Sequence, residues 1–167
     1  FLSEKLCDMI VEETENFNCW LEKDVGPNEE SKYTTTDTYL TSIPGIESAD
    51  ETPLKDLYIG LQHQYVTPII DRVWKWWPNH WDNPVVAKYS SDGQSFVEPH
   101  HDESVCATIV KLNNEYEGGG TYFEKQKKLV SSKKGWCTLH PSRLTHRHGS
   151  KRVTKGNRYI LVNFIGK

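Results

Sequence analysis

The sequence predicts a mainly β protein of the α+β class, a double-stranded β-helix (jelly roll) with N-terminal helices packed on one face. Its 167 residues suffice for one domain with a substantial core, which we expect to span residues 1–167. Apolar residues follow helical spacing before Pro84, and short β-branched and aromatic runs separated by turn residues follow it. Helices first and strands afterwards are typical of a sandwich with helices on one outer face.

Two helical segments are expected in the first half of the chain. The first covers Ser3–Trp20, where apolar residues recur at helical spacing behind Ser3, a residue type that caps helix N-termini. The second should begin near Pro53, because proline is favoured at the first helical position. Pro68 lies inside its apolar stripe and should kink the helix or split it in two. The polar stretch Glu22–Tyr39 is expected to be a loop with one short strand.

The second half of the chain predicts seven or eight short strands. The β-branched and aromatic runs that predict them are Val85–Tyr89, Ser95–Val97, Val105–Leu112, Thr121–Phe123, Lys128–Val130, Trp136–Leu139 and Tyr159–Ile165. Gly118–Gly120 and Lys134–Gly135 are expected to be tight connections with positive φ angles, which glycine adopts without strain.

The composition limits the kinds of partner that the chain is expected to bind. The net charge is −3 with both signs mixed along the chain, which disfavours nucleic acid, a partner that usually requires a basic stripe. No apolar run reaches the roughly 20 residues of a membrane helix, so no membrane span is expected. The chain begins at Phe1 without a signal peptide, which favours a piece of a longer protein. The compartment stays open.

The four cysteines show neither a CxxC motif nor zinc-type spacing. Cys106 and Cys137 lie in strand-like apolar runs and are expected to be buried free thiols. Whether Cys7 and Cys19 pair stays open at this point.

The segment Glu98-Pro-His-His-Asp102 carries the clearest chemical signal. In an extended strand His100 and Asp102 project from the same face, and His101 points away. A third ligand would come from a distant strand, and the candidates are His140, His146 and His148. Two histidines and one carboxylate that leave other positions open are typical of non-haem Fe(II) oxygenases. A structural zinc site would close all four positions with protein ligands.

Arg158 bears on the choice among the three histidines. A 2-oxoglutarate bound to such a metal carries a second carboxylate, whose burial without a cationic partner would cost several kcal/mol. Arg158 opens the last predicted strand, ten residues after His148. With a turn around Lys155-Gly156, His148 and Arg158 are expected on adjacent strands that face one cavity.

This pattern resembles the prolyl and lysyl hydroxylase branch of the 2-oxoglutarate dioxygenases. Four local matches bring it closer to the procollagen lysyl hydroxylases: Pro99-His-His-Asp-Glu-Ser104, Tyr116-Glu-Gly-Gly-Gly120, Lys134-Gly-Trp136 through His140-Pro-Ser-Arg-Leu-Thr-His-Arg-His148, and Gly156-Asn-Arg-Tyr159. The resemblance is strong over residues 84–165 and looser over residues 1–83. It implies that the chain is the C-terminal catalytic domain of a distant family member, and a giant-virus member is one candidate.

The resemblance also implies a site and an activity. His100, Asp102 and His148 would hold Fe(II), Arg158 would pair with the distal carboxylate of 2-oxoglutarate, and Tyr89 would hydrogen-bond this cosubstrate. Dioxygen and L-ascorbate would complete the reaction, which hydroxylates lysine in collagen-like Xaa-Lys-Gly sequences and releases succinate and CO2. The family further implies a homodimer and the endoplasmic reticulum or secretory pathway.

The sequence departs from the family pattern in the strand after the metal motif. Family members usually carry Thr and Asn where this chain has Ala107 and Ile109, which puts one cosubstrate contact in doubt. A prolyl hydroxylase or another 2-oxoglutarate dioxygenase is the nearest alternative, although the prolyl branch usually has Lys at the position of Arg158. A nucleic-acid demethylase is disfavoured by the acidic balance. A non-catalytic, metal-binding jelly-roll module for interactions is disfavoured by the intact set of three ligands.

Overall fold

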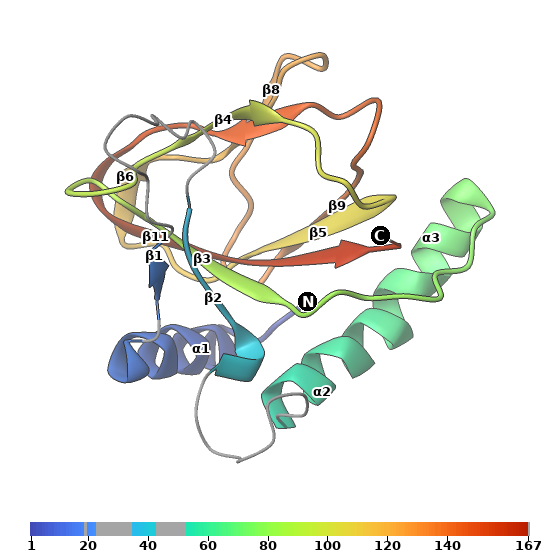
Figure 1. Ribbon diagram of the computed structural model, residues 1–167, viewed down its shortest axis with the longest axis horizontal. Helices are drawn as coiled ribbons and strands as arrows, with labels where there is room; N and C mark the ends of the chain where they lie inside the picture. Colours follow the sequence, from blue (N-terminus) through green and yellow to red (C-terminus); the bar gives the residue numbers. More distant parts are fainter. Residues whose placement is uncertain (19, 23–34, 43–52, 167) are drawn as a thin grey trace.

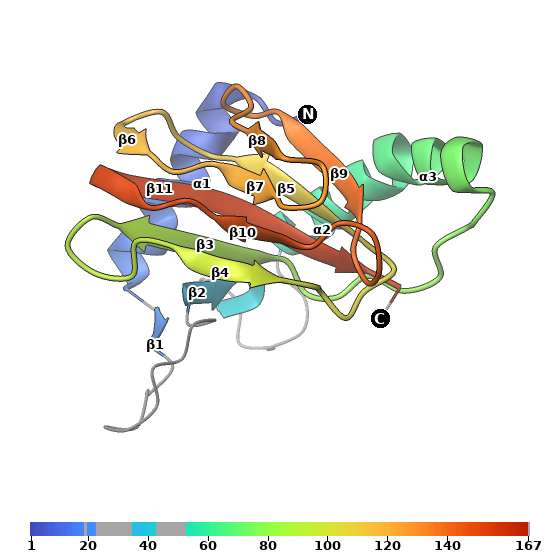
Figure 2. The same cartoon turned by 90° about the horizontal axis from the view of Figure 1, so that it is seen from above.

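Two antiparallel sheets face each other, and the helices cover the outer face of the larger sheet (Figures 1 and 2). The computed structural model describes residues 1–18, 20–22, 35–42 and 53–166 of the chain. The mainly β jelly roll with helices on one face is confirmed. In the described part, no helix has both the length and the apolar character needed to cross a membrane.

The first helix, α1 (Glu4–Phe17), matches the expected segment. The Ser3 hydroxyl accepts a hydrogen bond from the backbone N–H of Leu6 at 3.2 Å, so one of the otherwise unpaired N–H groups of the first turn is satisfied. Cys7 and Ile10 point from its inner side into the core.

The second helical segment is divided, as expected from its proline. It consists of α2 (Pro53–Leu61), a π-helical turn (Gln62–Val66) and α3 (Thr67–Trp74). Pro68 is the second residue of α3, which directly follows the π turn, so its missing N–H falls where the hydrogen-bond pattern of the helix changes. The wider π turn directly before it absorbs the change of helical register.

The larger sheet has the order β1-β2-β3-β11-β5-β9, and β6 pairs with one end of β11. Its strands are β1 (Leu21–Glu22), β2 (Thr36–Tyr39), β3 (Val85–Ser90), β5 (Cys106–Lys111), β6 (Tyr116–Gly118), β9 (Cys137–Pro141) and β11 (Val153–Ile165). A short 3₁₀ turn, Leu40–Ser42, follows β2.

The smaller sheet has the order β4-β10-β7-β8. Its strands are β4 (Val97–His100), β7 (Thr121–Phe123), β8 (Lys128–Val130) and β10 (His148–Ser150). This sheet lies across from β3 and β11 (Figure 1), and residues of both sheets line the space between them.

Side chains of the large sheet alternate between two apolar layers. Val86 and Leu161 face the helices and pack against Ile10 of α1, whereas Ala87 and Ile160 face the smaller sheet. Full burial of such side chains contributes about 1.5–3 kcal/mol each. The helix-facing layer is the main hydrophobic core, and the inner layer lines the cavity between the sheets.

The prediction of a buried free thiol is confirmed for Cys106 and only in part for Cys137. Cys106 is buried and Cys137 is partly buried, and both are free thiols. Cys7 is also a buried free thiol, and Cys19 lies outside the described residues.

One predicted connection is wrong. Gly156, with φ +73°, does not form a turn but lies inside β11, next to an irregularity in the pairing of β11 with β6. A Cβ there would lie 2.7 Å from the Glu115 carbonyl oxygen, so the glycine is needed for a close backbone approach. Residues 151–152 connect β10 of the small sheet with β11 of the large sheet. His148 and Arg158 therefore lie in opposite sheets and not on adjacent strands.

Candidate active site

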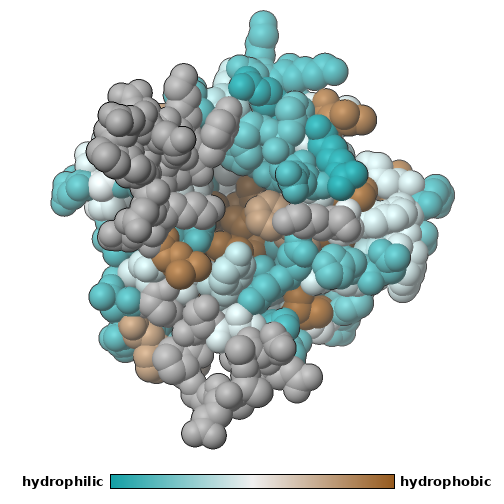
Figure 3. Space-filling model, viewed as in Figure 1, coloured by the Kyte–Doolittle hydropathy of each residue, from teal (hydrophilic) through white to brown (hydrophobic). Residues whose placement is uncertain are grey.

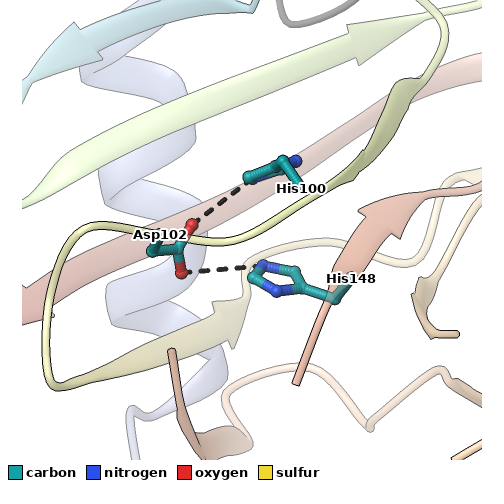
Figure 4. A group of neighbouring side chains, drawn as sticks. All are labelled: His100, Asp102 and His148. Atoms are coloured by element: carbon teal, nitrogen blue, oxygen red, sulfur yellow. Dashed lines mark ion pairs between the residues drawn. The ribbon is translucent and has the colours of Figure 1, made fainter. Parts of the chain in front are cut away.

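Three candidate ligands, two at the ends of β4 and β10 and one in the connection after β4, meet at one point (Figure 4). His148, the first residue of β10, pairs directly with His100, the last residue of β4. Asp102 follows two residues later and lies between the two rings. Its carboxylate oxygens are 3.3 Å from His100 Nε2 and 3.7 Å from His148 Nε2. The potential ligand atoms all lie within 4.8 Å of one another, which is close enough for one ion to contact all three.

Backbone carbonyls orient both imidazole rings. His100 Nδ1 lies 2.9 Å from the carbonyl oxygen of Glu98, and His148 Nδ1 lies 3.0 Å from that of His146. Since a carbonyl oxygen can only accept, each Nδ1 carries the proton and donates it. In its neutral form each ring therefore directs the lone pair of Nε2 to the centre of the group, the arrangement of metal-binding histidines.

The three groups set one another's charge. Burial opposes ionisation of Asp102, but the hydrogen bond with His100 and the charge of His148 outweigh it, so the pKa of Asp102 is lowered. Burial lowers the pKa of His148 below its ordinary value. For His100 burial acts in the same direction, but its hydrogen bonds to Asp102 and to the Glu98 carbonyl prevail and raise its pKa. An ionised carboxylate beside imidazoles is a donor set that suits a divalent cation.

The donor set fits iron(II) better than a structural metal. One oxygen and two nitrogen donors are present, and in the described ranges no fourth His, Cys, Asp or Glu joins the group. Three protein ligands leave positions open for small molecules, whereas structural zinc sites close all four.

The other histidines of the region lie outside the group. His140 is 3% exposed, and its ring packs edge-on at 4.6 Å from the His148 ring. Burial, followed by the charge of His148, lowers the pKa of His140 to about 4, so this ring is neutral. His146 contributes its carbonyl, as described above, and its ring nitrogen contacts the Thr145 hydroxyl at 2.8 Å. His101 is exposed, and its Nδ1 lies 3.3 Å from the carbonyl oxygen of Ser142.

A cavity of about 850 Å³ extends from the three ligands between the two sheets. Its walls include apolar residues of β3, β5 and β11, among them Ala87, Ile109 and Ile160. Figure 3 shows hydrophobic side chains at the centre of this face, with hydrophilic ones around them. Ile109 has no hydrogen-bonding group to offer, so at this position the wall is apolar. The cavity is large enough for a small organic acid together with a peptide side chain.

Arg158 lies at the inner wall of this cavity and is only 4% exposed. Its guanidinium donates to the hydroxyl oxygens of Ser150 at 3.0 Å and Thr121 at 3.3 Å. Its Nε is buried without a hydrogen-bond partner, and among the described residues no carboxylate forms an ion pair with Arg158. A buried cation with only neutral partners is costly. The wall is therefore suited to an anion, such as the distal carboxylate of 2-oxoglutarate.

Tyr89 lies beside this guanidinium. It is paired directly with Arg158 across β3 and β11, and the guanidinium carbon lies 5.3 Å from the centre of its ring. Burial raises the pKa of the Tyr89 phenol, although the nearby Arg158 charge opposes this. The hydroxyl therefore stays protonated and can donate a hydrogen bond inside the cavity.

Among the polar residues of the cavity that sequence reasoning missed are Ser150, Thr121 and Asp37. Ser150 follows His148 by two residues and thus faces the same side of β10, a period-2 relation that could have indicated it. Thr121 carried no comparable signal, because its place beside Arg158 depends on the pairing of β7 with β10.

Comparisons with known proteins give relatives for nearly the whole chain. The multifunctional procollagen lysine hydroxylase and glycosyltransferase LH3 of Rattus norvegicus is 33% identical over 171 residues, which cover 98% of this chain and 22% of that protein. Procollagen-lysine,2-oxoglutarate 5-dioxygenase 1 of Mus musculus is 31% identical over 170 residues, with the same coverage of 98% and 22%. The chain thus spans about a fifth of the length of these relatives. No protein-family model matches it.

Among solved structures, the viral collagen prolyl hydroxylase of Paramecium bursaria Chlorella virus-1, in complex with 2-oxoglutarate, has a TM-score of 0.67. It is 18% identical, and the alignment covers 98% of this chain and 90% of that one. At this identity the likeness concerns the fold alone. The chain is thus homologous to the procollagen lysyl hydroxylases over nearly its whole length, and it has the double-stranded β-helix fold of the 2-oxoglutarate- and iron(II)-dependent oxygenases.

Proposed function

We propose that this chain is the catalytic domain of an iron(II)- and 2-oxoglutarate-dependent lysyl hydroxylase. It would hydroxylate lysine in collagen-like Xaa-Lys-Gly sequences and release succinate and CO2. The observation that carries the proposal is the cavity. Three candidate ligands converge at one end, and its wall holds the buried guanidinium of Arg158, with which no carboxylate of the described residues forms an ion pair. The homology to lysyl hydroxylases supports lysine as the target.

The side chains have separate roles in this proposal. His100, Asp102 and His148 would hold Fe(II) through their Nε2 and carboxylate atoms. Arg158 would pair with the distal carboxylate of 2-oxoglutarate, and the Tyr89 hydroxyl would donate to the same molecule. When bound, iron with 2-oxoglutarate and dioxygen supplies the oxidising power for an unactivated C–H bond.

The rest of the chain orients these groups and keeps water away. The Glu98 and His146 carbonyls hold the two imidazoles in the tautomer that binds metal. The apolar walls of the cavity keep the reacting atoms in a region of low polarity, where the charge of Arg158 acts more strongly than in water. L-ascorbate as reductant, and assembly as a homodimer, are included on the resemblance alone; light scattering of the purified chain tests the dimer.

Mass spectrometry of a collagen-like peptide with Xaa-Lys-Gly repeats tests the proposal. Incubation with Fe(II), 2-oxoglutarate and ascorbate should add one oxygen to lysine, with an equal yield of succinate. Oxygen on proline instead would make the chain a prolyl hydroxylase, and no oxygen transfer at all would favour a binding module.

Two histidine variants form a matched pair for the metal site. His148→Ala should abolish succinate release and weaken Fe(II) binding, because it removes one of three ligands. His146→Ala removes a neighbouring imidazole but keeps the backbone carbonyl that orients His148, so activity should persist. The reverse result would show that the third ligand is wrongly assigned.

A further inference from the structure

The cavity contains carboxylates that the metal centre does not use. Besides Asp102, its described lining has two acidic side chains, Asp37 and Glu103. Glu103 directly follows the ligand segment and is exposed at the rim. Asp37 instead belongs to β2 and is half-buried in the large sheet, beside β3 (Figure 1).

Strand alternation aims Asp37 into the cavity. Thr35, Asp37 and Tyr39 line it, whereas Thr38 points to the opposite side and is fully buried. The Thr35 hydroxyl donates to a carboxylate oxygen of Asp37 at 2.5 Å, which restrains the carboxylate.

The sheet register places Asp37 near Tyr89 and Arg158, in the neighbouring row of side chains that face the cavity. Asp37 pairs with Ala87 of β3, which pairs in turn with Ile160 of β11. Tyr89 and Arg158 form the next inward-facing row, two residues along each strand, or about 7 Å away. The Asp37 charge influences Tyr89 across this distance. Burial is the main cause of the raised pKa of Tyr89, the Arg158 charge opposes the rise, and the Asp37 charge adds to it.

A lysine substrate brings a positive charge into this cavity. If the proposed function is correct, the ammonium group lies only two bonds from the carbon that is oxidised. Its burial without an anionic partner would be costly, and Arg158 would repel it. The oxygens of Asp102 are committed to the metal in the proposed site. A second carboxylate on the cavity wall would resolve this conflict.

We propose that Asp37 binds the ε-ammonium group of the substrate lysine and so makes the cavity selective for a cationic side chain. Tyr39, on the same face of β2, offers an aromatic surface for the methylene groups of that side chain. The carboxylate, held by Thr35, would be oriented before the peptide arrives.

The test pairs one charge on the protein with one charge on the peptide. Two fluorescent collagen-like peptides differ only in lysine or norleucine at the target position, and their binding to the Mn²⁺- and 2-oxoglutarate-loaded chain is measured by anisotropy. Asp37→Asn should weaken binding of the lysine peptide by about tenfold or more. It should change binding of the norleucine peptide by less than about twofold, because that peptide has no charge to pair.

Two variants serve as controls. Asp92→Asn removes an exposed carboxylate from the connection after β3, outside the cavity lining, and should leave both affinities unchanged. Asp37→Glu keeps the charge and should retain the preference for lysine over norleucine. Equal losses for both peptides in Asp37→Asn, or no loss for either, would overturn the role of Asp37.

Failure of this inference differs from failure of the proposed function. If the wild-type chain hydroxylates lysine but Asp37→Asn binds both peptides like wild type, only the inference is lost. If the wild-type chain transfers no oxygen to lysine, the proposed function and the inference are both wrong.

Discussion

If Arg158 binds the cosubstrate as proposed, its replacement should affect 2-oxoglutarate binding far more than folding. Arg158→Met replaces a buried cation by an apolar side chain of similar length. In the absence of 2-oxoglutarate the guanidinium has two hydrogen bonds to neutral hydroxyls, from Ser150 and Thr121. Each is worth about 1.5–3 kcal/mol, and desolvation of the ion costs several kcal/mol. We therefore expect the free energy of unfolding of the variant to lie within about 1 kcal/mol of wild type, or above it.

The same substitution should nearly abolish cosubstrate binding. The distal carboxylate would lose its charge-assisted hydrogen bonds and would stay buried without a cation, which costs about 3–5 kcal/mol. Because each 1.4 kcal/mol corresponds to about tenfold in affinity, the dissociation constant for 2-oxoglutarate should rise by about 100- to 3,000-fold. Metal affinity should stay near wild type, since Arg158 is not among the three candidate ligands.

Urea unfolding with Mn²⁺ as a redox-stable metal measures both effects. At 100 times its dissociation constant, 2-oxoglutarate should stabilise the wild-type chain by about 2.7 kcal/mol. The same concentration should give Arg158→Met almost no stabilisation, whereas Mn²⁺ alone should stabilise both proteins equally. The reasoning fails if 2-oxoglutarate stabilises the variant as much as wild type, or if the variant without ligand has lost more than about 3 kcal/mol.

Two glycine substitutions, with a third as control, test the backbone beside the site and in α2. In Gly149→Ala the new Cβ would lie 2.5 Å from the Val97 carbonyl oxygen of β4. We therefore expect the free energy of unfolding in urea to fall by about 1–3 kcal/mol. Metal binding should also weaken, because His100 belongs to β4. Gly93→Ala is the matched control, because its Cβ would meet one atom at an ordinary 3.8 Å; an equal loss there would refute the steric explanation. Gly60→Ala, exposed in α2 with no atom within 4 Å, should raise the unfolding free energy by up to about 1 kcal/mol, and a decrease would contradict this helix-propensity estimate.

Local sequence signals predicted the helices and the hydrophobic strands well. Ser3 and Pro53 mark helix starts because capping and the missing proline N–H act within a few residues. The expected strand Tyr159–Ile165 is the β-branched and aromatic half of β11. Its first half, which includes Gly156, has weak strand propensity and is held by pairing with β6, a contact that no local pattern reveals.

The site was harder to predict for the same reason. The motif His100-His-Asp102 is local, and its two outer residues are neighbours in the structure. β10 has only three residues, His148-Gly-Ser150, and none is β-branched, so its strand conformation comes from pairing with β4 and β7. Asp37 was assigned to a polar stretch, although the threonines on both sides of it are typical of a strand.

The geometry of the site is divided between the two sheets. His100 and His148 are directly paired in the small sheet, and Tyr89 and Arg158 are directly paired in the large one, so a one-residue shift in either register would turn these side chains outward. Each pair is thus fixed by the backbone of its own sheet. The distance between the metal end and Arg158 is instead set by the apolar layer between the sheets. In the proposed site, residues of that layer would therefore set the length of the acid that fits between the metal end and Arg158, although they need not bind it.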